Sequence, residues 1–387
     1  MITTGKALAI HLNLLKTAAE NVLRSKMRSA VVLVALVAIL FPFITGIAIS
    51  EGVRQESMIS VENGADLYVT YDQYGKTGPV PITWADSVLA LPAVKEVVPR
   101  VIGRVYLQDK LVVLVGIDPA NYDPGITIVE GRLPEKPFEA VIGRGIADYL
   151  KLDVGQRFTF SSYPDRLFML VGIFKGGTSI WSSDLMLTSF EAAGEVFRQP
   201  ELATDLLLSV RSGYETGVSE QLAAMNPRFR MQDRALIQRY FDRGFRLKEG
   251  IFTAIYTVAF ALAIPALLVV SGLGLSDRRR EIGVLKATGW HTSEVLEMVV
   301  WENLIISLIS APVAVLLSIV WIEGLRGTFI AQFFISEAGL IADFDIPAEY
   351  APLPVFLSVL FALLLTLMGS IYSSWRSAIV PPAEAMK

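Results

Sequence analysis

Four long apolar segments limit what this chain can fold into more than any other feature of its sequence. They cover residues 29–50, 251–275, 299–322 and 352–375. An α-helix needs roughly 20 predominantly apolar residues to cross the hydrocarbon core of a bilayer, and each segment reaches that length. The sequence therefore predicts a helical membrane protein with four spanning helices, in which residues 51–250 form a domain outside the bilayer.

The composition supports this class and excludes several kinds of chemistry. Hydrophobic residues make up 53% of the chain and charged residues only 19%, whereas soluble domains carry about a quarter of charged residues. The net charge of −4 argues against a nucleic-acid partner. There is no cysteine, which excludes disulfides and thiolate metal sites, and His11 and His291 are too few for a histidine metal cluster. We expect no catalytic, cofactor-binding or metal-binding residue in this chain.

The apolar segments themselves contain few polar interruptions. Only the third has a charged residue, Glu302, which lies one turn from its start and is expected to reach the membrane interface. Prolines 42, 265 and 312 lie inside segments, as neighbouring helices permit in a bilayer. The first segment is longer than the apolar part of a cleaved signal peptide, which has about 7–15 residues. We therefore expect it to be retained.

Basic residues flank these segments unequally, and cytoplasmic loops carry the excess of Lys and Arg. Those on the expected inner side are Lys6, Lys16, Arg24, Lys26, Arg28, Arg278, Arg279, Arg280, Lys286, Arg376 and Lys387. In the loop at 323–351, Arg326 stands alone among five acidic residues. The pattern predicts that the ends, residues 1–28 and 376–387, and the loop 276–298 are cytoplasmic. Residues 51–250 and 323–351 are then outside.

The outer domain is predicted to be of mixed α+β type. Short runs alternate as half-buried strands do, at 65–71, 104–118, 139–147, 157–162, 166–175, 183–189 and 205–211. Helical pieces are expected at 84–91, 190–197 and 214–225. No motif for catalysis or calcium binding is found among them. The glycine-serine loop at 174–184 is open to two interpretations, a contact for a partner or substrate and an ordinary surface turn.

Two kinds of helix are expected beside the membrane. Residues 49–61 and 231–252 are predicted to extend the first and second spanning helices into the outer domain as stalks. Residues 5–28 predict a basic amphipathic helix whose apolar side is formed by Leu8, Leu12, Leu15, Ala19, Val22 and Leu23. Such a helix lies on the inner membrane surface, or its last turns extend the first span.

The cytoplasmic loop begins with three arginines and continues as a short helix. Ile282 and Leu285 give this helix an apolar side, and Gly283 and Gly289 permit close approach. Gly289 is expected to end the helix in the left-handed conformation. A new helix then starts with Thr292 or Ser293 as its N-cap. A short helix held between two spans can pass force to both of them.

At these residues the chain resembles a known family. "RRREIGVLKATGW", followed by "VLEMVVWENLIISLISAPVAVLL", looks like the corresponding part of MacB/FtsX-type ABC transporter permeases. Further similarities lie in "ENVLRSKMRSAVVLVALV", in "EGRLPEKPFEAVIGRGIADYLKLDVGQRFTF" and in the closing "PPAEAMK". These pieces occur in the family's order and at its spacing, so the resemblance extends over nearly the whole chain.

The resemblance implies a permease dimer, of identical or different subunits, in a bacterial inner membrane, driven by two cytoplasmic ABC ATPase subunits. The inner loop would be the coupling helix, whose contact residues are Arg279, Arg280, Glu281, Ile282, Gly283, Leu285, Lys286, Ala287 and Gly289. Because this sequence has no G-x-x-x-x-G-K-[ST] phosphate loop, ATP and magnesium would bind a separate chain. The family also implies contacts with lipid and with a periplasmic adaptor or carrier.

Several functions remain open on the sequence alone. The permease could export a compound through an adaptor and outer-membrane channel, or release lipoproteins or lipids from the outer leaflet. A signalling or scaffold protein, such as a division-type regulator of cell-wall hydrolases, is the alternative. A secondary transporter is disfavoured because an alternating-access site is usually built from repeats around discontinuous helices.

Overall fold

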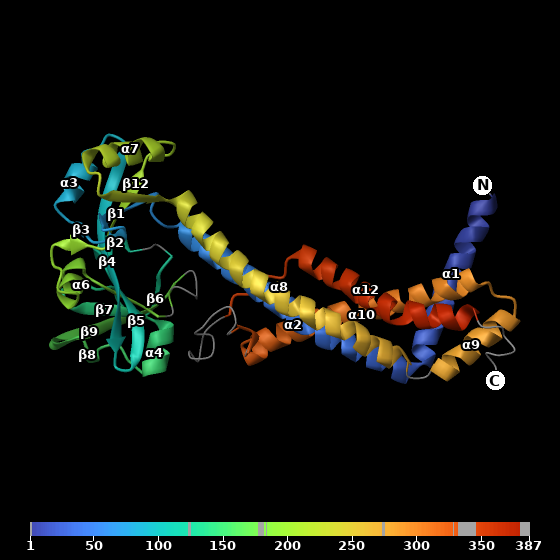
Figure 1. Ribbon diagram of the computed structural model, residues 1–387. Helices are drawn as coiled ribbons and strands as arrows, with labels where there is room; N and C mark the ends of the chain where they lie inside the picture. The colour runs from blue at the N-terminus through green and yellow to red at the C-terminus, as the bar shows by residue number, and fades with distance from the viewer. Residues whose placement is uncertain are drawn as a thin grey trace. The chain divides into compact units, whose positions relative to one another are not determined.

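The computed structural model describes residues 2–122, 125–176, 182, 184–272, 275–327, 329–331 and 346–379. The chain divides into two compact units. The first contains Met1–Glu51, Leu247–Phe334 and Ala348–Lys387, and the second contains Gly52–Arg246 and Ile335–Pro347. Figure 1 labels the helices and strands of both.

A long mixed sheet organises the second unit (Figure 1). Its strands pair in the order β13-β1-β12-β4-β5-β10-β7-β9-β6, with β2 added to β1 and β8 added to β9. Their bounds are β1 Leu67–Gln73, β2 Lys76–Gly78, β4 Val94–Leu107, β5 Lys110–Gly116, β6 Thr127–Gly131, β7 Glu139–Gly143, β8 Arg157–Phe160, β9 Tyr163–Lys175, β10 Leu185–Thr188, β12 Asp205–Val210 and β13 Phe229–Asp233. A separate pair joins β3 (Val80–Pro81) and β11 (Leu202–Ala203).

Strand β4 contributes residues to both hydrophobic cores of this unit that include helix residues. Its first half pairs with β12, and its second half pairs with β5. One core lies between the sheet and helices α3 (Trp84–Leu89) and α7 (Glu215–Met225). The other lies under α4 (Arg144–Leu150) and α6 (Phe190–Val196) and contains phenylalanines packed edge to face, such as Phe160 and Phe168. The α+β prediction for this domain is therefore confirmed.

Two details of the strand prediction were wrong. The run at 104–118 is a hairpin instead of one strand, because Gln108, at φ +55°, turns the chain between β4 and β5. The run at 139–147 is a strand only as far as Gly143, and helix α4 begins at Arg144. Ile146 and Ala147 are buried, but they belong to helix α4. A buried helix and a buried strand can both show such a short apolar run, so the sequence pattern does not distinguish them.

A buried carboxylate closes the loop between β6 and β7. Glu139 accepts hydrogen bonds from both terminal nitrogens of Arg132, at 2.8 and 2.7 Å, and from the backbone N–H groups of Glu135 and Lys136. The hydrogen bonds from Arg132 contribute most to lowering the pKa of Glu139 to about 2. The carboxylate thus stays ionised and ties the loop down at neutral pH.

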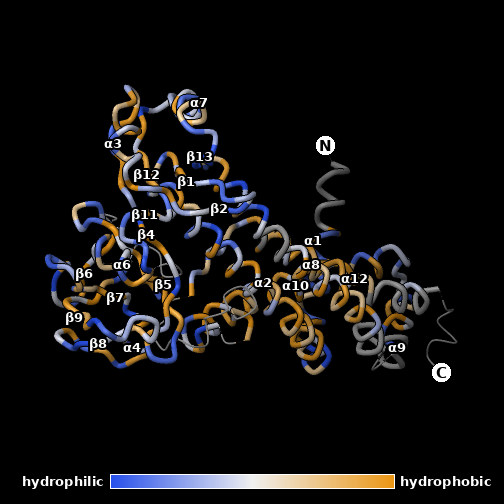
Figure 2. The backbone as a smooth tube through the Cα atoms, turned by 60° about the vertical axis from the view of Figure 1, so that its left-hand side comes forward, coloured by the Kyte–Doolittle hydropathy of each residue, from blue (hydrophilic) through white to orange (hydrophobic). Residues whose placement is uncertain are grey.

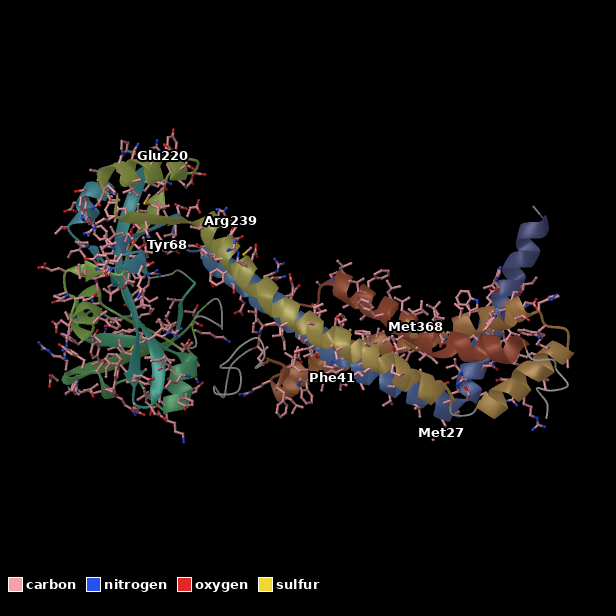
Figure 3. All side chains as sticks on the ribbon, viewed as in Figure 1. Met27, Phe41, Tyr68, Glu220, Arg239 and Met368 are labelled. Atoms are coloured by element: carbon pink, nitrogen blue, oxygen red, sulfur yellow. The ribbon has the colours of Figure 1, made fainter. Side chains whose placement is uncertain are left out.

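The first unit is helical. Its helices are α1 (Ile2–Arg24), α2 (Lys26–Glu62), α8 (Arg234–Gly272), α9 (Leu275–Ala287), α10 (Thr292–Leu325) and α12 (Pro352–Ile379). Of the described residues, two helices are long and apolar enough to cross a membrane, Lys26–Glu62 and Thr292–Leu325. Shorter apolar stretches occur at Gly250–Pro265 and Val355–Met368. Figure 2 shows the apolar colouring along α10 and α12.

Helices α2 and α8 both extend into the residues predicted as stalks. Helix α2 continues from the first apolar segment to Glu62, and α8 begins at Arg234 before the second. The helical continuation predicted at 49–61 is present in α2. The one predicted at 231–252 is present only from Arg234, because residues 231–233 belong to strand β13.

Helices α2, α8, α10 and α12 share one apolar core in the first unit. Small residues of α10 allow close packing there: Ser307, Ala311, Ala314 and Ser318 are all fully buried. Thr45 of α2 donates a hydrogen bond to Ser318 at 2.9 Å, and Ser318 bonds the Tyr350 hydroxyl at 2.9 Å. Such hydroxyl pairs hold helices together where no water competes.

Candidate functional site

Helix α9, the predicted coupling helix, has a well-defined end. Trp290 N–H donates to the Leu285 carbonyl at 3.1 Å, and Gly289 N–H donates to the Lys286 carbonyl at 3.1 Å. This pair of bonds is the Schellman motif, which requires a left-handed residue at the glycine position. Gly289 has φ +100°, so the prediction that it ends the helix is confirmed.

The next helix starts one residue earlier than expected. The N-cap of α10 is His291, whose backbone is extended at φ −77° and ψ 152°. Glu294 accepts a hydrogen bond from His291 N–H at 2.8 Å. Thr292 and Ser293, the predicted caps, already lie within the helix. The reciprocal Glu at the third helical position, which completes a capping box, was the signal that could have located this start.

One side of α9 is attached to the rest of the first unit. Ile282 and Val295 of α10 are both fully buried and pack together with Trp290. Gly283 is also buried, as its predicted role in close approach requires. Gly289 is exposed, and a Cβ there would meet no atom within 4 Å. It is therefore needed for its backbone conformation and not for close approach.

The opposite side of α9 is exposed. Arg280, Val284, Ala287 and Thr288 are exposed, and their spacing places them on one face of the helix. Glu281, Leu285 and Lys286 are half-buried at its borders. The side chain of Arg279 lies outside the described residues. The predicted set of ATPase-coupling residues thus contains both buried and exposed residues. It omitted Val284 and Thr288, although they lie four and eight residues after Arg280 and therefore on the same face of a helix.

Helix α1 packs on α10 close to this site. Leu14 and Ala18 are buried, and the side chain of His11 contacts that of Glu297. Asn21 Nδ2 donates to Glu302 Oε1 at 3.1 Å. Glu302 is only 7% exposed, so its side chain does not project from the protein surface; its level in a bilayer stays a prediction. Its carboxylate instead meets a polar residue of α1, which a reading of α10 alone cannot reveal.

The predicted apolar side of α1 coincides only in part with the packed one. Leu12 and Leu23 of that side are 56% and 69% exposed, whereas Leu15, Ala19 and Val22 are half-buried and Val22 packs against the core of the first unit. The described residues therefore cover this side only in part, and Lys16 and Arg24 are exposed beside it.

Metal-ligating side chains are not grouped among the described residues. No group of three His, Cys, Asp or Glu among them could hold a metal ion. Most of the glycine-serine loop at 174–184 lies outside the described residues, so neither of its two interpretations is tested.

Comparisons with known proteins agree with the resemblance. Residues 29–224 match the MacB-like periplasmic core domain, and residues 253–382 match the FtsX-like permease C-terminal model. A lipoprotein-releasing system transmembrane protein, LolC of Haemophilus influenzae, is 22% identical over 71% of this chain and 72% of its own length.

Two solved structures of outer domains are also similar to this chain. One is the periplasmic region of MacB from Actinobacillus actinomycetemcomitans, with 13% identity and a TM-score of 0.37 over 47% of this chain and 95% of that one. The other is the extracellular domain of the transporter YknZ from Gram-positive bacteria, with 13% identity and a TM-score of 0.35 over 43% and 99%.

The two family models follow each other along the sequence, and the periplasmic core model alone covers half of the 387 residues. The chain therefore belongs to the MacB/FtsX-type family of ABC transporter permeases.

Proposed function

We propose that this permease converts ATP hydrolysis by a separate ATPase subunit into movement of its outer domain, which extracts a lipid-modified substrate from the outer leaflet. ATP and magnesium bind only the ATPase, and this chain carries out no reaction of its own. Two permease copies and two ATPases form the working complex.

The geometry of α9 is the observation that carries this proposal. The helix is attached on one side through Ile282 and Val295 and exposes Arg280, Val284, Ala287 and Thr288 on the other. A partner that binds the exposed face can move α9 without unfolding it, because the Schellman motif and the capping box fix both the end of α9 and the start of α10. Movement of α9 then passes to α10.

The proposed topology has four spanning helices with both ends of the chain in the cytoplasm. The helices α2, α8, α10 and α12 pack around one core, as four helices that cross a bilayer together would. The excess of Lys and Arg near α1 and α9 places these two helices on the inner side of a bacterial inner membrane.

The substrate class is proposed from the relatives. The relative from Haemophilus influenzae is a protein of a lipoprotein-releasing system. Apart from Glu302, which bonds Asn21, the buried polar residues described in α2, α8, α10 and α12 carry hydroxyl or amide groups. They offer no chain of ionisable groups for a soluble polar cargo. Release of a lipid-anchored substrate fits that membrane part better than export of a polar compound through it.

The test is reconstitution with the ATPase that co-purifies with the chain. Proteoliposomes would contain a fluorescently labelled lipopeptide, and its transfer to a soluble acceptor would be measured with and without ATP. We expect transfer only when permease, ATPase and ATP are all present. Transfer by the permease alone, or recovery of the chain from membranes without any nucleotide-hydrolysing subunit, would contradict the proposal. If an unacylated drug were transferred and the lipopeptide were not, the proposed substrate would be wrong and the permease would export unacylated compounds instead.

A further inference from the structure

The first turns of α10 contact α1 as well as α9. Asn21 Nδ2 of α1 lies 3.1 Å from Glu302 Oε1 and 3.5 Å from Met298 Sδ. Met298 is fully buried and Glu302 nearly so. A hydrogen bond to a carboxylate is stronger than one between neutral groups, and its loss leaves the half-buried Asn21 amide without that acceptor. The pair therefore fixes α1 to α10 at a defined position.

The same end of α1 is also fixed to α2. Ser25 separates the two helices, and both its backbone N–H and its hydroxyl donate to the Asn21 carbonyl, at 2.9 and 2.8 Å. Ser29 of α2 donates from its hydroxyl to the Val22 carbonyl at 3.0 Å and lies 3.3 Å from the Ser25 hydroxyl. Serine hydroxyls that bond carbonyls in this way stabilise a bend in a helix. The direction in which α1 leads into α2 is thus set by local bonds.

We propose that Asn21 and Glu302 are positioning residues through which movement of α9 and α10 reaches the start of α2. This inference rests on the proposed function. Val295 takes up the movement of α9 at Ile282, Glu302 passes it to α1 on a following turn of α10, and the Ser25–Ser29 bend passes it to α2. Since α2 is unbroken to Glu62, α1 is then part of the transmission and not only a membrane anchor.

The experiment compares Asn21→Leu, Glu302→Leu, their double mutant and Glu302→Gln in the full complex with its ATPase. Asn13→Leu is the matched control, because Asn13 lies on the same helix and is exposed. The measured quantities are recovery of the complex, ATP hydrolysis, and lipopeptide released per ATP hydrolysed. We expect each leucine variant to lower release per ATP at least tenfold while complex recovery stays unchanged. The double mutant should lose no more than either single one, because both remove the same bond.

A second measurement, the distance between spin labels on α1 and α10, reports directly on the Asn21–Glu302 contact. The chain has no cysteine, so spin labels can be placed at Leu12→Cys of α1 and Leu308→Cys of α10, both about half exposed. In the wild-type background the distance should have one narrow distribution, with and without ATP and vanadate. It should broaden in Asn21→Leu and Glu302→Leu. Glu302→Gln, whose amide oxygen still accepts from Asn21, should restore both the narrow distribution and most of the release.

The outcomes separate this inference from the proposed function. Unchanged release per ATP in both leucine variants overturns the inference and leaves the function standing. Additive losses, with complex recovery falling in parallel, also overturn it, because they indicate packing alone. Absence of ATP-driven release by the wild-type complex overturns the proposed function and this inference with it.

Discussion

Ile282 of α9 and Val295 of α10 pack against each other with no exposed surface on either side chain. The two residues lie on opposite sides of the turn that contains Gly289, so their contact closes the loop between the helices. It also determines which face of α9 points away from the protein. Several expected outcomes follow from this arrangement and from the packing of the rest of the chain.

Replacing Ile282 with Ala should loosen α9 without unfolding the chain. Removing a buried isoleucine side chain down to alanine costs about 2–5 kcal/mol where the site cannot collapse. Hydrogen exchange of the peptide that covers 275–290 should therefore speed up, while exchange in the outer domain stays the same. Ile282→Val, which removes one methylene group, should cost about 1 kcal/mol. Equal exchange in Ile282→Ala and wild type would show that the contact does not hold α9.

Replacing Val284 with Asp should weaken ATPase binding at least tenfold and leave the stability of the permease unchanged. The side chain is 49% exposed on the outward face of α9, so the substitution costs little in the free protein. Val129 of β6 is also 49% exposed, and Val129→Asp is the matched control. The measurement is recovery of the ATPase with the tagged permease. Equal recovery with both variants would rule out this face as the docking surface.

Replacing Gly289 with Ala should reduce coupling through backbone strain. A side chain at φ +100° costs about 1–2 kcal/mol, although the Cβ itself would meet no atom. Gly155, at φ +94° and equally open, provides a control with the same strain in the outer domain. Both variants should unfold at slightly lower temperature, but only Gly289→Ala should lower ATP-driven release. A similar loss of release in Gly155→Ala would show that general stability explains the effect.

Replacing Gly46 with Ala should disturb the packing of α2 on α8. The new Cβ would stand 2.1 Å from Cζ of Phe252, so the ring must move, at a cost of about 1–3 kcal/mol. The midpoint of thermal unfolding in detergent micelles should fall, and the second substitution Phe252→Leu should restore much of it. Gly250→Ala, which adds a Cβ into open space, should not lower the midpoint. An unchanged unfolding midpoint in Gly46→Ala would contradict the close packing of Gly46 against Phe252.

Replacing Glu139 with Gln should destabilise the outer domain at neutral pH by about 1.5–3 kcal/mol, the range for hydrogen bonds to a charged group. Because its folded-state pKa is lowered from 4.5 to about 2, the ionised carboxylate stabilises the fold above about pH 4.5. That contribution disappears as the pH falls toward 2. The stability gap between wild type and Glu139→Gln should therefore narrow from pH 5 to pH 3, as measured by hydrogen exchange of the β6–β7 loop.

Glu130→Gln is the control for that experiment. Glu130 also bonds an arginine, Arg144, at 2.7 Å, but its side chain is 52% exposed, and exposed pairs contribute about 0–1 kcal/mol. Equal losses in the two variants would indicate that burial of Glu139 does not strengthen its ion pair.

Features that depend on neighbouring residues could be predicted from the sequence. The end of α9 at Gly289 is one, because a left-handed residue there satisfies carbonyls only three to five positions back. The continuation of α2 and α8 beyond their apolar parts and the α+β character of residues 51–250 are others. In each case the period of apolar residues or the identity of one residue decides the local backbone.

The sequence by itself thus determined where helices run, where they end and which segments are apolar. Only the tertiary structure decided which faces meet: Leu14 and Ala18 of α1 are buried while Leu12 and Leu23 of its predicted apolar side are exposed, and Glu302 is buried beside Asn21. Those two residues are 281 positions apart. Their contact depends on how three helices pack together, and no local pattern of charge or hydrophobicity encodes the partner of a buried polar group.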